Sequence, residues 1–192
     1  MLDRMSRPAA TLATGFLTTG LLTTGMLAGG FLTDALAPPA HAAPAGARRG
    51  AVIAKIGIRR IGLKARVLHG IAPEMLQKGA GHYPGTAYPG REGNVVLLGH
   101  RTTYLAPFGR INELRRGDPI VLSVGRTSYV YKVRGKRIIM PTDRRALEAV
   151  PFKRGSVANG KYVTLITCHP KGSDRRRLVV VGAFHHTSGR GR

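Results

Sequence analysis

Residues 163–181 read VTLITCHPKGSDRRRLVVV and decide how the chain folds. The first run is β-branched and apolar, which predicts a buried strand that ends at Cys168. The Pro-x-Gly-Ser break at 170–173 predicts a turn, and the apolar run at 178–181 predicts a second strand. If these two strands pair through the turn, Cys168 and Arg177 lie close together at one rim of the sheet.

Cys168 is the only cysteine in the chain. A cysteine attacks as the thiolate, and a free thiol is only about 3% ionised near neutral pH, so a nucleophile needs a cation or a base beside it. Arg177 would supply a permanent charge. The alternative is that Cys168 is a small buried hydrophobe.

The first 43 residues have the pattern of a targeting segment. Arg4 and Arg7 precede a long span, 9–37, that carries no charge except Asp34 and is long enough to cross a bilayer. The small residues of PPAHAA at 38–43 fit a signal-peptidase site, so a cleaved signal peptide and an uncleaved membrane anchor both remain open. Either way we expect the remainder to be exported. An unpaired thiol in an exported domain favours a reactive role, since such domains commonly use cysteines in disulfide pairs.

After this segment we expect a linker at 44–50, one catalytic domain at 51–186 and a polar tail at 187–192. The formal net charge is +22, and all but two of the 31 Lys and Arg residues follow residue 43. Such a charge draws a domain towards lipid headgroups, wall polyanions or nucleic acid. Nucleic acid is disfavoured because the chain carries an export signal and no nucleic-acid-binding motif.

The pattern along the exported part predicts an all-β fold with a few short helices. We expect two edge strands within 51–68, a short helix at 72–76, a turn-rich loop at 82–93 and a helical turn at 108–114, with a second short helix ending near 147. Further strands are expected at 94–98, 119–124, 128–133 and 137–140, before the two at Cys168. About eight short strands of this kind predict a closed or nearly closed β-barrel.

His100 is the histidine best placed to serve as a base. It follows the apolar run 94–98, so it stands at a strand end in the same manner as Cys168. His169 is next to the cysteine, but adjacent strand residues point to opposite faces. A purely structural role for His100 is the alternative.

These residues resemble the signatures of one enzyme family. TLITC at 164–168, followed by Arg177 before an apolar strand, resembles the TLxTC…R signature of sortases, and LGH at 98–100 resembles the sortase histidine motif. The segments GHYPGTAYPG, GNVVLLGHRTTYLAPF and INELRRGD resemble class E sortases. The resemblance covers residues 51–183.

The resemblance implies a closed eight-stranded barrel and a cysteine transpeptidase. Such an enzyme cuts a C-terminal Leu-Ala-X-Thr-Gly-type signal of a secreted protein between Thr and Gly and transfers the protein to a peptidoglycan amine. It implies Cys168 as nucleophile, His100 as acid and base, and Arg177 as the group that steadies the oxyanion or orients the backbone of the signal. Thr167 and Tyr83 are implied as substrate-binding residues. No metal and no organic cofactor are expected, and the scarcity of carboxylates disfavours a calcium site.

Two other functions compete with this one. An L,D-transpeptidase is also exported and uses Cys and His, although its motif is Ser-x-Gly-Cys where this chain has Leu-Ile-Thr-Cys. A non-enzymatic basic module that docks on wall polyanions would need no reactive thiol, and its binding would fall steeply with added salt.

Overall fold

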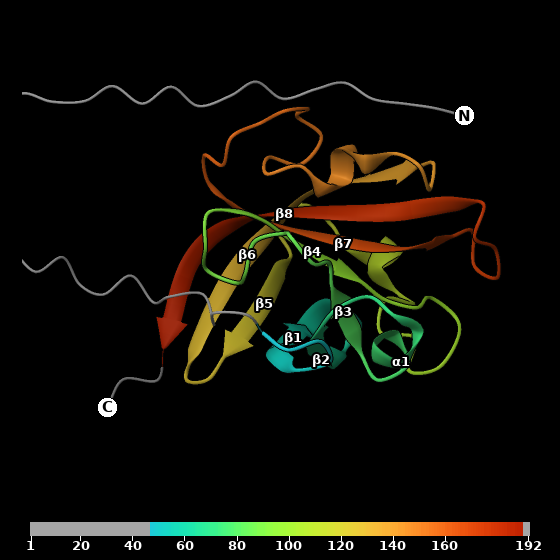
Figure 1. The fold of residues 1–192 in the computed structure, drawn as a ribbon, viewed down its shortest axis with the longest axis horizontal. Helices are drawn as coiled ribbons and strands as arrows, with labels where there is room; N and C mark the ends of the chain where they lie inside the picture. The colour runs from blue at the N-terminus through green and yellow to red at the C-terminus, as the bar shows by residue number, and fades with distance from the viewer. Residues whose placement is uncertain (1–46, 190–192) are drawn as a thin grey trace, which may run out of the picture. The chain divides into compact units, whose positions relative to one another are not determined.

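The computed structural model describes residues 47–189, which contain eight strands and four very short helical segments (Figure 1). The strands are β1 (Val52–Ile58), β2 (Leu63–His69), β3 (Ala80–His82), β4 (Gly93–Leu98), β5 (Pro119–Val124), β6 (Thr127–Ile139), β7 (Lys161–His169) and β8 (Arg176–Gly189). The helical segments are η1 (Arg59–Ile61), α1 (Pro73–Leu76), η2 (Ile111–Glu113) and η3 (Arg144–Leu147).

The eight strands close into one barrel in the order β1-β2-β3-β4-β7-β8-β6-β5, with β5 returning to β1. All neighbours are antiparallel except the pairs β2–β3 and β4–β7, which are parallel. Closure removes the exposed sheet edges that an open sheet would leave. The predicted all-β, closed eight-stranded barrel is confirmed.

The inner face of the barrel follows the period of two expected of strands. On β4 and β7, Val95, Leu97, Val163 and Leu165 point inward and are fully buried in the main core. That core also holds the bulky side chains of Phe108, Ile111, Leu114 and Tyr131.

A second, smaller hydrophobic cluster covers the outer face of β4, β7 and β8. We call it the outer cluster; its buried members are Val96, Ala146, Ile166 and Val179, and Tyr83, Leu98, Ile139, Leu147, Phe152 and Val181 pack against them. Several of these residues come from the segment between β6 and β7, drawn in orange across β8 in Figure 1. The segment between β6 and β7 therefore covers part of this outer face.

Strands β6 and β3 differ from the expected strands. The two strands expected at 128–133 and 137–140 form the single strand β6, whose ladder with β8 shifts register between Val133 and Gly135. Gly135 interrupts the alternation at this irregularity, which is why the pattern indicated two strands. Strand β3 was not expected, because Ala80–His82 has only three residues and is shown only by its pairing with β2 and β4.

Strand β8 continues to Gly189, into the segment expected to be a polar tail from residue 187. Its last residues pair with the start of β6, Thr127 opposite Gly189, although their side chains are exposed. Exposure on both faces explains why this part of the strand carries no apolar alternation.

The predicted short helices are present at α1, η2 and η3. Asp143 caps η3 by accepting a hydrogen bond from the backbone N–H of Arg145 at 3.1 Å. Within residues 47–189, no helix is long and apolar enough to cross a bilayer. The predicted signal peptide or anchor at 1–43 lies outside the described residues.

Candidate active site

Cys168 and Arg177 face each other across two antiparallel strands. They are direct partners in the ladder of β7 and β8, so their side chains leave the sheet on the same face. Ile166 and Val179 are the positions two residues away on each strand, and both belong to the outer cluster. The thiol and the guanidinium therefore project from the outer face, at the end of the outer cluster.

His100 follows the end of β4, the strand that neighbours β7. Strand β4 runs parallel to β7 with Leu98 opposite Ile166, and the pairing continues one residue further, where the Gly99 N–H donates to the Ile166 carbonyl at 3.1 Å. Leu98 packs on the outer cluster, and His100 comes two residues later, just beyond the end of β4. His100 and Cys168 come two residues after Leu98 and Ile166, and Arg177 comes two residues before Val179 on the antiparallel strand.

Gly99 is required by the packing behind this rim. A Cβ atom at residue 99 would lie 2.7 Å from the Phe108 ring, which is fully buried. The Phe108 N–H donates to the His100 carbonyl at 3.1 Å, so the loop 101–107 leaves the barrel at His100 and returns to the same point. The glycine of LGH therefore allows the close turn that presents the imidazole.

Tyr104 lies over His100, with ring centroids 5.0 Å apart and a 42° angle between the rings. Its backbone has φ = 52°, in the left-handed region that residues other than glycine seldom adopt. Its hydroxyl accepts a hydrogen bond from Gln77 Nε2 at 3.2 Å. The loop thus holds an aromatic ring against the imidazole at some cost in backbone strain.

The Arg177 guanidinium folds back over the β7–β8 turn. Its Nη1 donates to the backbone carbonyls of Asp174 and, at 3.1 Å, of Arg176. None of the salt bridges among the described residues includes Arg177. The charge is consequently available to an anionic group at the rim.

Thr167 and Tyr83 take different positions. Thr167 is buried, and its hydroxyl donates to the Gly99 carbonyl at 2.7 Å, so its proton already has an acceptor. Tyr83 packs on the outer cluster, held by a backbone hydrogen bond from its N–H to the Val96 carbonyl at 2.9 Å. Tyr83 therefore shares a face with the thiol, whereas the Thr167 side chain joins β7 to the histidine segment.

Sequence reasoning missed Arg101, the residue directly after His100. Its exposed fraction is only 7%, yet it forms no salt bridge among the described residues. One of its amino groups lies 3.1 Å from the Cys168 carbonyl oxygen and 2.8 Å from His169 Nδ1. One arginine in a chain with 31 basic residues shows no distinguishing signal, so only the fold could reveal it.

A separate group of three rings lies beneath the loop between β3 and β4. His69 Nδ1 lies 3.2 Å from His82 Nδ1 and 3.3 Å from the Tyr88 hydroxyl. His82 Nε2 lies 2.9 Å from the Ala87 carbonyl, which only accepts, so this nitrogen carries the proton. Burial lowers the pKa of His82 below its ordinary value, because desolvation disfavours the imidazolium.

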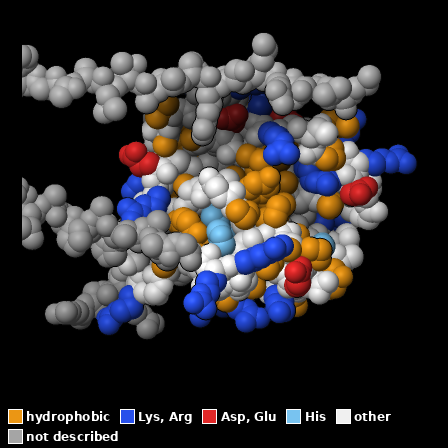
Figure 2. Space-filling view, viewed as in Figure 1, with side chains coloured by type: hydrophobic (Ala, Val, Ile, Leu, Met, Phe, Trp, Pro, Cys, Tyr) orange, Lys and Arg blue, Asp and Glu red, His pale blue; other side chains and the backbone are white. Residues whose placement is uncertain are grey.

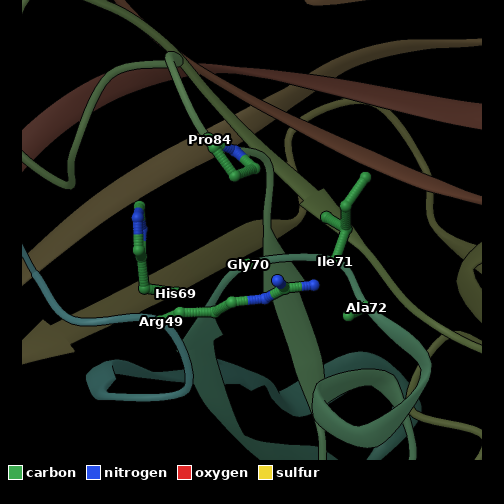
Figure 3. Close-up of a pocket in the computed structure, with 6 residues that line it drawn as sticks. All are labelled: Arg49, His69, Gly70, Ile71, Ala72 and Pro84. Carbon is green, nitrogen blue, oxygen red and sulfur yellow. The ribbon is translucent and has the colours of Figure 1, made fainter.

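The pocket beside these rings does not include the thiol. Its volume is about 410 Å³, and it is lined by Arg49, His69, Gly70, Ile71, Ala72 and Pro84. Figure 3 shows the Arg49 side chain running along it towards Ala72, away from the His69 ring. We do not place the reaction here, because Cys168, His100 and Arg177 do not line this pocket.

The face of the barrel that carries β7 and β8 is both apolar and basic. Figure 2 shows hydrophobic side chains in the middle of the face that carries β7 and β8, with Lys and Arg side chains at several places around them. Among residues 47–189, no group of three His, Cys, Asp or Glu residues is placed to hold a metal ion. A thiol, an imidazole and a guanidinium at or just beyond the ends of three neighbouring strands are the kinds of group that acyl transfer uses as nucleophile, proton carrier and anion-stabilising charge.

Comparisons with known proteins point to one family. Residues 56–185 match the sortase domain family. Sortase SrtE1 of Streptomyces coelicolor is 34% identical over 141 residues, which make up 69% of this chain and 40% of that protein. This chain therefore spans less than half the length of that relative.

Solved structures agree with this match. Sortase E from Streptomyces avermitilis has 37% identity and a TM-score of 0.67, covering 74% of this chain and 93% of that one. The SrtA sortase from Actinomyces oris has 30% identity and a TM-score of 0.71, covering 76% and 87% of the two chains. The resemblance to class E sortases that the motifs indicated is confirmed, and it favours this family over the L,D-transpeptidases.

Proposed function

This chain belongs to the sortase family, and from that premise we propose that it is a cell-wall-sorting transpeptidase. It cuts a C-terminal Leu-Ala-X-Thr-Gly-type signal between Thr and Gly and joins the threonine carboxyl to a peptidoglycan amine. Its clients are secreted proteins that carry such a signal. It works on the extracytoplasmic side of the membrane, with residues 1–43 as anchor or signal.

The reaction proceeds through a thioester. The Cys168 thiolate attacks the threonine carbonyl carbon, and the carbonyl oxygen becomes an oxyanion beside Arg177. His100 donates a proton to the leaving glycine amine as the C–N bond breaks. An incoming amine then attacks the thioester, His100 takes a proton from it, and the Cys168 thiolate leaves.

The pairing of Cys168 with Arg177 is the observation that carries this proposal. Cys168 supplies the nucleophile, and Arg177 places a permanent cation directly opposite it on the neighbouring strand. The same cation lies near the point where the oxyanion develops, where removing one stabilising group commonly costs about 2.7–4 kcal/mol. The pairing of β4 with β7, which continues through Gly99, supports His100 as their partner.

The remaining residues shape the site. Thr167 acts by keeping Gly99 against β7, since its hydroxyl donates to the Gly99 carbonyl. Tyr83 recognises the signal from the outer cluster, where its ring packs on the face that carries the thiol. The net charge of +22 favours a position close to the anionic polymers and lipids of the cell envelope.

A peptide assay tests the proposal. The described barrel lies within residues 47–189, so protein that begins at residue 44 keeps all of it. We expect it to cleave a fluorogenic Leu-Ala-X-Thr-Gly peptide in the presence of an amine, and mass spectrometry to find an acyl adduct on Cys168. Cys168→Ala should lose turnover completely while its thermal unfolding stays close to that of the wild type.

The controls decide between the candidate functions. Cleavage by Cys168→Ala would overturn the mechanism. An inert wild-type protein whose binding to wall polyanions falls steeply with salt would instead support the non-enzymatic basic module. A Leu-Pro-X-Thr-Gly peptide, compared at equal concentration, measures the preference for alanine.

A further inference from the structure

Arg101 is a buried arginine without an acidic partner. Its exposed fraction is 7%, its Nε atom is buried without a hydrogen-bond partner, and none of the salt bridges of residues 47–189 includes it. Burying an unpaired guanidinium is costly. Other interactions or a functional role must therefore offset the free-energy cost of burying this guanidinium.

The contacts of this side chain join three segments. Nη1 donates to the Cys168 carbonyl at 3.1 Å and to His169 Nδ1 at 2.8 Å, and Nη2 donates to Asn112 Oδ1 at 3.3 Å. Arg101 itself directly follows His100. The guanidinium of Arg101 thus connects the segment that carries His100 to the main chain of Cys168 and to the η2 segment.

Backbone pairing alone does not reach this far. Strand β4 ends at Leu98, and Gly99 makes the last main-chain hydrogen bond to β7. From His100 onward the chain turns away, and Phe108 folds back to the His100 carbonyl. The Arg101 side chain is therefore the connection to β7 that lies beyond the imidazole.

We infer that Arg101 is a positioning residue of the transpeptidase: it sets the orientation of His100 relative to Cys168 by joining the segments that carry them. This inference rests on the proposed function of those two residues. Arg101 contacts the main chain of the nucleophile and no reacting atom. It acts in every step in which the imidazole and the sulfur must cooperate.

The fork geometry of arginine explains why this residue type is needed. A guanidinium presents donors in fixed directions from two amino groups, whereas a lysine ammonium is a single point. A lysine at 101 would keep the charge but could not span the Cys168 carbonyl and Asn112 together. Lysine and glutamine variants therefore separate bridging from charge.

The test measures kcat and KM of Arg101→Lys and Arg101→Gln with the Leu-Ala-X-Thr-Gly peptide. We expect kcat to fall about 100-fold in both variants, because a misplacement of about 1 Å in a catalytic group can cost that much. KM should stay within about threefold of the wild type, since Arg101 does not touch the signal. The matched control is Arg116→Gln, an exposed arginine that donates to the Arg134 carbonyl, and it should leave both constants unchanged.

A double-mutant cycle between Arg101 and Asn112 adds a variant at an exposed residue, where a substitution is less disruptive to folding. Asn112 is exposed, and Asn112→Ala removes one contact of the bridge. We expect its kcat to fall about 2- to 10-fold, as for the loss of one hydrogen bond. Combined with Arg101→Gln it should cost nothing further, because both changes break the same connection.

Several results would overturn the inference. Arg101→Lys with kcat within about threefold of the wild type would show that charge is sufficient. Additive losses in the cycle, or a lower kcat fully explained by a lower melting temperature, would exclude a bridge to the nucleophile. Full activity of Arg101→Gln alongside an inactive Cys168→Ala would refute this inference and leave the proposed function intact.

Discussion

Two groups of polar side chains in this barrel have contrasting surroundings. At the rim, His100, Cys168 and Arg177 are half-buried, and among the side-chain hydrogen bonds of residues 47–189 neither the imidazole nor the thiol takes part in one. Beneath the β3–β4 loop, His82 is fully buried, and both of its ring nitrogens have partners.

The difference separates reactive groups from structural ones. His82 stabilises the loop because its hydrogen bonds are complete, and its ring is enclosed. His100 is only half-buried, its ring nitrogens make no side-chain hydrogen bond among residues 47–189, and the Tyr104 ring lies against it. A histidine at a strand end is thus a candidate for catalysis only where the fold leaves its nitrogens unused.

The largest expected effect comes from measuring both activity and stability for an alanine variant of each histidine. His100→Ala should lower kcat by about 100- to 10,000-fold, the range for losing a general acid–base group, with little change in melting temperature. His82→Ala should lower the free energy of unfolding by about 1–3 kcal/mol, because buried partners lose a hydrogen bond, and leave kcat within about threefold below the melting range. Equal losses of activity in both variants would erase the distinction.

Removing the charge at the rim should have the next largest effect. Arg177→Gln is expected to lower kcat/KM by about 100- to 1,000-fold, the cost of losing one oxyanion-stabilising group. Arg175→Gln is the matched control, two residues away on the same turn and exposed. If both variants lost activity equally, the general basic charge of the turn, and not the residue opposite Cys168, would be responsible.

The smallest effect concerns stability and pH. Burial lowers the pKa of His82 in the folded protein, so between that value and its ordinary value of about 6.5 the unfolded chain binds more protons. The free energy of unfolding should therefore fall as pH drops below about 6.5, by at most about 1.4 kcal/mol per pH unit for this one group. Chemical denaturation from pH 7.5 to 5 measures this slope.

His82→Gln isolates the contribution of that histidine. Glutamine keeps an N–H donor for the Ala87 carbonyl but does not titrate, so the slope should become flatter. An unchanged slope in this variant would assign the pH dependence to other groups. Enclosure of the ring would then not be what distinguishes His82 from His100.

Much of the fold was predictable because it depends on local patterns. The β-branched runs that end at Leu98 and Cys168 predicted two strands whose ends carry polar residues, and the turn at 170–173 predicted that β8 pairs with β7. The glycine-containing irregularity in β6 and the three-residue β3 were missed. In both, the residue pattern is weak and the strand is recognisable only through its partners.

The sequence by itself determined the family, the strand ends and the identity of the candidate nucleophile, since a lone cysteine and its flanking motifs are local facts. Only the tertiary structure decided which side chains are enclosed. Three contacts show this, because they join residues 13 to 68 positions apart. They are the contact of His69 with His82, the hydrogen bond from Thr167 to Gly99 and the hydrogen bond from Arg101 to His169. Such contacts depend on strand register and barrel closure, which no short stretch of sequence encodes.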